Sequence, residues 1–203
     1  MASNEYHFIT QWSVRGTLRE VSDILGDAMA LPRWWPSVYL AVREVAPGDP
    51  QTGLGREIDL YTKGWLPYTL RWWFRVVEAH PPDGFAIEAH GDFEGRGAWT
   101  FEQRGDWVEI TYDWRIAADK PLLRYLSWLM KPIFAANHRW AMAQGEQSLK
   151  LELARRRAET DEERALIPAP PPPTRRLPFV LAGGGALALM AVAFAGVAFV
   201  RRR

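Results

Sequence analysis

The chain has 203 residues, with 25 lysines and arginines against 24 aspartates and glutamates, so its formal net charge is only +1. A balance this even gives no global positive field, and nucleic acid is therefore excluded as an expected partner. Cysteine is absent, which excludes disulfide bonds, thiolate metal sites and a cysteine nucleophile. Eleven tryptophans are many for this length, and they predict an unusually aromatic interior.

The first predicted elements are one strand and two short helices. Tyr6–Val14 alternates apolar and polar residues, which is typical of a half-buried strand. A helix should follow, because Thr17 can cap it, Glu20 stands at the capping-box position and Gly26 can end it. A second short helix is expected to end just before Pro36.

Six further strands are predicted from the next eighty residues, where the apolar pattern keeps a period of two. Turn residues such as Gly105 and Asp106 separate these segments, and the short connections predict antiparallel neighbours. The predicted strands are Val38–Val45, Gly55–Thr62, Tyr68–Glu78, Phe85–His90, Gly95–Gln103 and Val108–Ile116.

A long helix is predicted from Pro121 to Arg157. Its last turn is basic, which suits the negative end of the helix dipole. The residues expected to face the sheet recur at steps of three and four, and they are Leu122, Leu126, Leu129, Ile133, Asn137, Trp140 and Gln144.

This order of elements resembles the START and Bet v 1-like (SRPBCC) superfamily, in particular its polyketide cyclase/dehydrase-like branch. The resemblance covers Tyr6–Arg157 and rests on the topology, on the phrase Trp34–Pro36, on Gly53–Gly55 and on the segment Gly91–Phe101. It implies an α+β helix-grip fold in residues 1–157, with a seven-stranded antiparallel sheet wrapped on the long helix. It also implies a cavity that holds a hydrophobic molecule.

The aromatic residues that face inward are the candidate ligand-binding site. They could line an apolar pocket with a few polar tips, or they could simply fill the space under the helix. The candidate set is Trp34, Trp35, Tyr68, Trp72, Phe74, Trp99, Phe101, Tyr112, Trp114, Asn137 and Trp140.

Motifs that would indicate a particular chemistry are missing. The sequence has no glycine-rich phosphate loop, no pair of histidines at metal-ligand spacing and no nucleophile elbow, so we expect no metal and no cofactor. His138 interrupts the apolar stripe of the long helix, and it is the weak catalytic candidate together with Tyr112. The other histidines and the charged residues around Asp92 are expected to lie on solvated faces.

The C-terminal region predicts a membrane anchor. Residues 158–178 read as a linker, charged at first and then proline-rich, and the prolines favour a stiff extended spacer of roughly 30 Å. Phe179–Val200 has no charged residue, and its 22 residues at about 1.5 Å each match the thickness of a bilayer core. A basic tail, residues 201–203, follows. Because Met1–Tyr6 lacks the pattern of a secretory signal, we expect the N-terminal domain to be cytoplasmic.

These observations favour a membrane-anchored binding protein for a lipid or another hydrophobic small molecule. The alternative is a cyclase or dehydratase that acts on an aromatic or polyketide substrate in the same cavity. A third hypothesis is an interaction module that recruits a partner through Pro168–Pro173.

Overall fold

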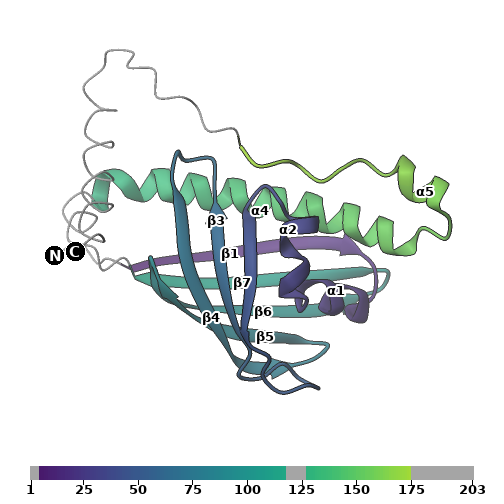
Figure 1. Cartoon of the computed structure of the whole chain (residues 1–203), viewed down its shortest axis with the longest axis horizontal. Coiled ribbons are helices and arrows are strands. Elements are labelled where there is room, and N and C mark those ends of the chain that lie inside the picture. The colour runs from purple at the N-terminus through teal and green to yellow at the C-terminus, as the bar shows by residue number, and fades with distance from the viewer. Residues whose placement is uncertain (1–4, 118–126, 175–203) are drawn as a thin grey trace, which may run out of the picture.

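The structure, a computed structural model, describes residues 5–117 and 127–174 (Figure 1). In these residues seven antiparallel strands form one sheet with the order β1-β7-β6-β5-β4-β3-β2. This confirms the predicted strands and their pairing, with boundaries shifted by one or two residues. The strands are β1 (Glu5–Arg15), β2 (Tyr39–Ala46), β3 (Glu57–Lys63), β4 (Thr69–His80), β5 (Gly84–Gly91), β6 (Glu94–Arg104) and β7 (Trp107–Ala117).

Short helices fill the connection between β1 and β2, as the sequence predicted. In α1 (Leu18–Leu25) the backbone N–H of Glu20 donates to the Thr17 hydroxyl at 3.2 Å, and the Glu20 carboxylate accepts from the Thr17 N–H at 2.8 Å. This reciprocal capping box satisfies two of the donors that every helix start leaves unpaired. Two further short helices follow α1: η1 (Ala28–Ala30) and α2 (Leu31–Trp34).

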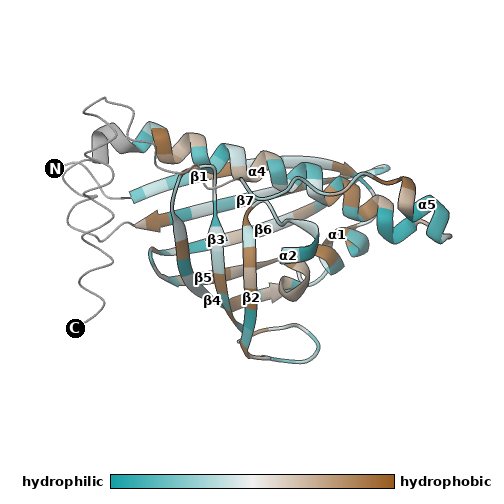
Figure 2. Ribbon diagram, turned by 45° about the horizontal axis from the view of Figure 1, so that its top comes forward, coloured by the Kyte–Doolittle hydropathy of each residue, from teal (hydrophilic) through white to brown (hydrophobic). Residues whose placement is uncertain are grey.

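The strands bury one face and expose the other. On β3, Ile58 and Leu60 are buried while Glu57 and Asp59 point outward and pair with arginines of neighbouring strands. Figure 2 shows the same alternation of hydrophobic and hydrophilic residues along the strands. The inward residues form one core beneath α4 (Ser127–Arg157), which crosses the concave face of the sheet (Figure 1). The helix-grip architecture is therefore confirmed.

The face that α4 turns inward differs from the predicted one. Trp140 and Gln144 are only half-buried, whereas Met142 and Leu149 are buried against the core. The rotation of the helix is set by Gly145, because a Cβ atom there would overlap the indole ring of Trp35. Small residues allow this close approach but carry almost no hydrophobic signal, so the apolar periodicity wrongly placed Trp140 and Gln144 on the inward face, although Asn137 does line the cavity described below. The predicted start of this helix, 121–126, lies outside the described residues.

The segment after α4 is more ordered than the predicted linker. Residues Asp161–Leu166 form α5, whose start is closed by a capping box between Thr160 and Glu163. The sequence pattern is the same as at Thr17, with a threonine followed three residues later by a glutamate. The neighbouring prolines and charges nevertheless led to the prediction of a linker without a helix. No helix within residues 5–117 and 127–174 is both long and apolar enough to cross a membrane. The predicted span 179–200 lies outside these ranges, so the anchor stays a prediction.

Candidate functional site

A cavity of about 210 Å³ lies between the concave face of the sheet and the N-terminal half of α4. It sits at the end of the sheet where β1 begins, β7 ends and the β3–β4 and β5–β6 turns come together; we call this end the mouth. The side chains that line it come from almost every element, and they include Tyr6, Phe8, Trp35, Val38, Tyr39, Thr62, Tyr68, Leu70, Trp72, Phe93, Tyr112, Trp114, Ile116, Phe134, His138, Ala141 and Met142.

Stacked aromatic rings make the walls rigid. The Tyr112 ring lies on Trp99, with centroids 4.0 Å apart, and it also stacks on Trp114 at 5.6 Å. Trp72 packs against Phe93 at 5.0 Å and donates its indole N–H to the Thr62 hydroxyl at 3.0 Å. Such rings hold their positions through many mutual contacts, so the space between them is preformed rather than collapsed.

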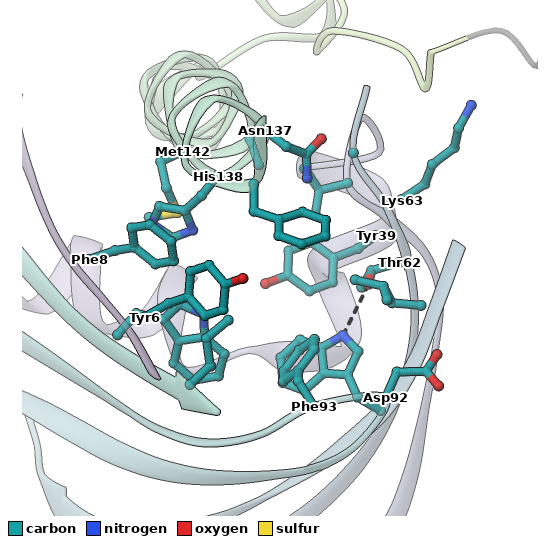
Figure 3. A pocket seen from close by; sticks show the side chains of 18 of the residues that line it. Tyr6, Phe8, Tyr39, Thr62, Lys63, Asp92, Phe93, Asn137, His138 and Met142 are labelled. Atoms are coloured by element: carbon teal, nitrogen blue, oxygen red, sulfur yellow. Dashed lines mark hydrogen bonds between the residues drawn. The ribbon is translucent and has the colours of Figure 1, made fainter. Parts of the chain in front are cut away.

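Tyrosine hydroxyls supply the polar tips of the cavity. Figure 3 shows the hydroxyl groups of Tyr6 and Tyr39 pointing toward one another from opposite walls. Burial raises the pKa of both phenols, as it does for Tyr68 and Tyr112. All four therefore stay protonated at neutral pH and can donate a hydrogen bond.

Two buried donors of this wall have no hydrogen-bond partner among the described residues. They are the hydroxyl group of Tyr6, a residue that is only 7% exposed, and the indole N–H of Trp35. An unpaired buried polar group costs about 1–3 kcal/mol, so such groups tend to mark places where something else binds. These two donors point to a ligand that carries hydrogen-bond acceptors.

His138 forms part of the helix side of the cavity. Its ring stacks on Phe8 with centroids 4.4 Å apart, and its Nε2 lies 3.3 Å from the Thr10 hydroxyl (Figure 3). Burial, assisted by the positive charge of Arg139, lowers the pKa of His138 to about 4. The imidazole is therefore neutral at pH 7 and can serve as a hydrogen-bonding group, but it is a weak base there.

At the mouth, Asn137 fastens the β3–β4 loop to α4. Its side-chain oxygen accepts the backbone N–H groups of Trp65 at 3.0 Å and Leu66 at 3.4 Å. The approach is so close that a Cβ atom on Gly64 would overlap the Asn137 amide. Asn137 was predicted as a ligand contact; it lines the cavity, but its oxygen is engaged in holding the loop.

The structure brings together about half of the predicted site. Trp35, Tyr68, Trp72, Tyr112, Trp114, Asn137 and His138 all line the cavity. The others do not. Trp34 and Phe101 are buried in the core at its far side, Phe74 faces a different cavity, and Trp99 supports the wall from behind Tyr112. Trp140 is half-buried and does not line the cavity, because α4 turns another face toward it.

Several lining residues were missed by the sequence analysis. Tyr6 and Phe8 fall on one face of the predicted first strand, but their distance in sequence from the other aromatics hid their role. Asp92 was assigned to a solvated face, yet it lines the mouth and accepts the backbone N–H of Arg71 at 2.8 Å. The alternation along β1 could have indicated the first two residues, whereas nothing in the sequence indicated Asp92.

A second, larger cavity of about 390 Å³ lies at the opposite end of the sheet, between α1 and the β4–β5 strands. Its walls include the charged residues Asp23, Asp27 and Arg56 beside apolar ones. Arg56 is bound to Glu44 at 2.6 Å and reaches the carbonyl oxygen of Gly26. The first cavity is the better candidate, because its walls are rigid aromatic rings and the unpaired hydroxyl group of Tyr6 points into it (Figure 3). Among the described residues there is no cluster of acidic, histidine or cysteine side chains that could hold a metal ion.

Comparison with solved structures places the fold among known proteins. A protein from Thermus thermophilus matches with a TM-score of 0.59 and 12% identity, over 75% of this chain and 100% of that one. The Zhui aromatase/cyclase from a Streptomyces species matches with 0.58 and 14%, over 76% and 97% of the two chains. The di-domain aromatase/cyclase StfQ of the steffimycin biosynthetic pathway matches with 0.55 and 16%, over 77% of this chain and 52% of that chain.

At these identities the likeness establishes a shared Bet v 1-like fold. Neither the scan against family models nor the search of curated proteins gives a match to this sequence.

Proposed function

We propose that this chain is a membrane-anchored binding protein that holds a lipid or another hydrophobic small molecule between the sheet and α4. The observation that carries the proposal is the aromatic cavity of about 210 Å³ with unpartnered donors in its wall. Its volume exceeds the ~150 Å³ of an engineered apolar cavity that binds benzene, and it is far larger than the roughly 10–15 Å³ that one water needs.

The chemistry of the walls defines the class of ligand. Four protonated phenols and a neutral imidazole give an interior without formal charge, so a charged group buried there would lose its hydration without gaining a counter-ion. We therefore expect a ligand with an apolar or aromatic body and one or two oxygen acceptors near Tyr6. A charged end, if the ligand has one, would stay at the mouth beside Lys63 and Asp92.

Ligand binding is tested by filling the cavity. Ala141 lines it, and Ala141→Phe should remove most of the free volume and abolish binding of a hydrophobic fluorescent probe such as N-phenyl-1-naphthylamine. Ala143→Phe is the matched control, because residue 143 is exposed on the same helix. Equal probe binding by both variants, with both folded by circular dichroism, would contradict the proposal.

The anchor is tested separately by flotation with phospholipid vesicles. The full chain should float, and a chain that lacks residues 179–200 should stay at the bottom of the gradient. A full chain that remains soluble without vesicles or detergent would remove the membrane from the proposal and leave the binding site untouched.

A cyclase or dehydratase reaction in the same cavity is the second candidate, because His138 lies in the wall and two of the similar structures reported above are aromatase/cyclases. The low pKa of His138 and the raised pKa of Tyr112 make both poor proton carriers at pH 7. If the protein turns over a polyketide substrate, His138→Gln should abolish turnover while probe binding is retained. Turnover that survives this change would remove His138 from the reaction.

A further inference from the structure

The chain after α5 does not lead away from the domain. Residues 167–174, called the strap from here on, run back alongside α4 toward the mouth of the cavity (Figure 1). Near its start, the guanidinium of Arg155 on α4 donates to the carbonyl oxygen of Pro168. Because polyproline geometry rises about 3.1 Å per residue, the six steps from Pro168 to Thr174 cover about 19 Å along the helix.

The end of the strap is bound to the loop that follows β3. The ammonium group of Lys63 donates to the backbone oxygen of Thr174 at 2.6 Å, and the Thr174 hydroxyl donates to the carbonyl oxygen of Gly64 at 2.9 Å. Lys63 is only 6% exposed, so its charge is held in place rather than free in solvent. Residues 167–174 are therefore docked on the domain, which the proline run could not reveal because its partners are distant in sequence.

This docking fixes where the chain leaves the domain. Gly64 lines the cavity, and its loop is fastened to α4 by Asn137, so Thr174 lies at the mouth. Five residue steps separate Thr174 from Phe179, and at about 3.6 Å per extended residue they reach at most about 18 Å. A membrane span that begins at Phe179 cannot start farther than this from the mouth.

The rim of the mouth has the side chains of a membrane contact. Trp65 is 43% exposed and Pro67 beside it is also exposed, although most tryptophans of the described chain are buried or half-buried. Tryptophan is favoured at the level of lipid headgroups because its ring is apolar and its N–H is polar. Lys131 lies over the Tyr6 ring at 5.5 Å, and Arg175 and Arg176 follow the strap in sequence. These cations suit anionic headgroups.

We infer that the β3–β4 loop and the mouth rest on an anionic phospholipid bilayer, so that the ligand passes between lipid and cavity without crossing bulk water. This inference rests on the anchor of the proposed function. It adds an orientation: the mouth faces the membrane, and the opposite end of the sheet, with the β2–β3 loop, faces away.

The absence of cysteine makes the orientation directly measurable. Pro67→Cys places a single label in the loop at the mouth, and Gln51→Cys places one in the β2–β3 loop at the other end of β3. The full chain, labelled with the fluorophore NBD, is reconstituted into vesicles of phosphatidylcholine and phosphatidylglycerol that contain nitroxide-labelled lipid. Quenching should be several-fold stronger at position 67 than at position 51.

The role of the strap is tested in the same vesicles. Lys63→Met combined with Thr174→Val removes both contacts at the end of the strap, and the quenching at position 67 should fall toward that at position 51. Lys150→Met is the control, since Lys150 is an exposed lysine whose ammonium group is bound to Glu146 on the same helix.

The outcomes separate this inference from the proposed function. Equal quenching at positions 67 and 51 in a chain that floats with the vesicles would overturn the inference and leave the anchor intact. A chain that does not float would refute the anchor itself. Strong quenching at position 67 that is unchanged by the Lys63 and Thr174 substitutions would show that the loop reaches the lipid without the strap, and it would overturn the strap's part in the inference.

Discussion

The Tyr6 hydroxyl lies in an apolar wall without a partner among the described residues. Tyr6→Phe should therefore raise the free energy of unfolding by about 1 kcal/mol, because the desolvated group disappears. The same change should weaken the binding of hydrophobic probes that carry an oxygen acceptor, while probes without one bind as before. Chemical denaturation and probe titration measure the two effects.

Tyr61→Phe is the matched control, since this ring lies on the outer face of β3 under the Arg71 guanidinium, at 4.7 Å. It should leave both quantities unchanged. A Tyr6→Phe protein that is less stable than the parent would mean that the hydroxyl has a partner after all.

His138 makes the stability of the domain depend on pH. Its pKa is lowered to about 4 in the folded state, against an ordinary value near 6.5, so the unfolded chain binds the proton first. The contribution of the neutral ring is fully present above about pH 6.5 and is lost as the pH falls toward 4, by up to about 1.4 kcal/mol per pH unit. Denaturation of His138→Gln between pH 7 and 4 should show a flatter profile. His80→Gln, at the exposed end of β4, should keep the parent's slope.

The pairing between α2 and α4 depends on one buried carboxylate. Glu152, which is 1% exposed, accepts two hydrogen bonds from Arg33, at 2.7 and 2.8 Å, and one from Arg156 at 3.0 Å. Burial alone would raise the pKa of Glu152, but the bonds from Arg33 and Arg156 outweigh it and the net pKa is lowered. The carboxylate is thus charged and fully paired at neutral pH.

Glu152→Ala should cost about 2 kcal/mol of unfolding free energy, because it removes three charge-assisted hydrogen bonds from a buried carboxylate while Arg33 and Arg156 remain partly exposed to water. Urea denaturation measures this loss. Glu146→Ala removes the more exposed pair with Lys150 on the same helix and should change stability by less than about 1 kcal/mol. Similar losses for the two variants would show that the Arg33 contact contributes little.

The elements were largely predictable from the sequence, while their mutual rotation was not. Alternation of apolar residues and the capping box at Thr17 are local signals, and they gave seven strands and α1 correctly. The rotation of α4 depends on where Gly145 allows the helix to approach Trp35, and that contact joins residues more than a hundred positions apart. Hence the predicted site contained the right strand faces but the wrong helix residue, Trp140.

At the scale of the whole molecule, the strap should stabilise the domain through Lys63. A chain that ends at residue 166 leaves the buried ammonium without the Thr174 carbonyl, so it should unfold about 1–2 kcal/mol more easily than a chain that ends at 174. Thermal and urea denaturation of the two chains measure the difference. In a Lys63→Met background the difference in unfolding free energy between the two chains should shrink, because the ammonium group that the Thr174 carbonyl oxygen binds has been removed. Equal stability of the two chains in the parent background would mean that water replaces the strap without loss.

The pairing of β1 with β7 has a consequence for how the protein is made. β1 lies at the edge of the sheet, and its only strand partner in the described chain is the last strand to leave the ribosome. At the usual 5–20 residues per second, the roughly ninety residues between them take about 5–18 seconds to synthesise. During that time the nascent first strand offers open backbone groups and the rings of Tyr6, Phe8 and Trp12 to any neighbour. The first strand can therefore enter the sheet only after the other six strands have been synthesised.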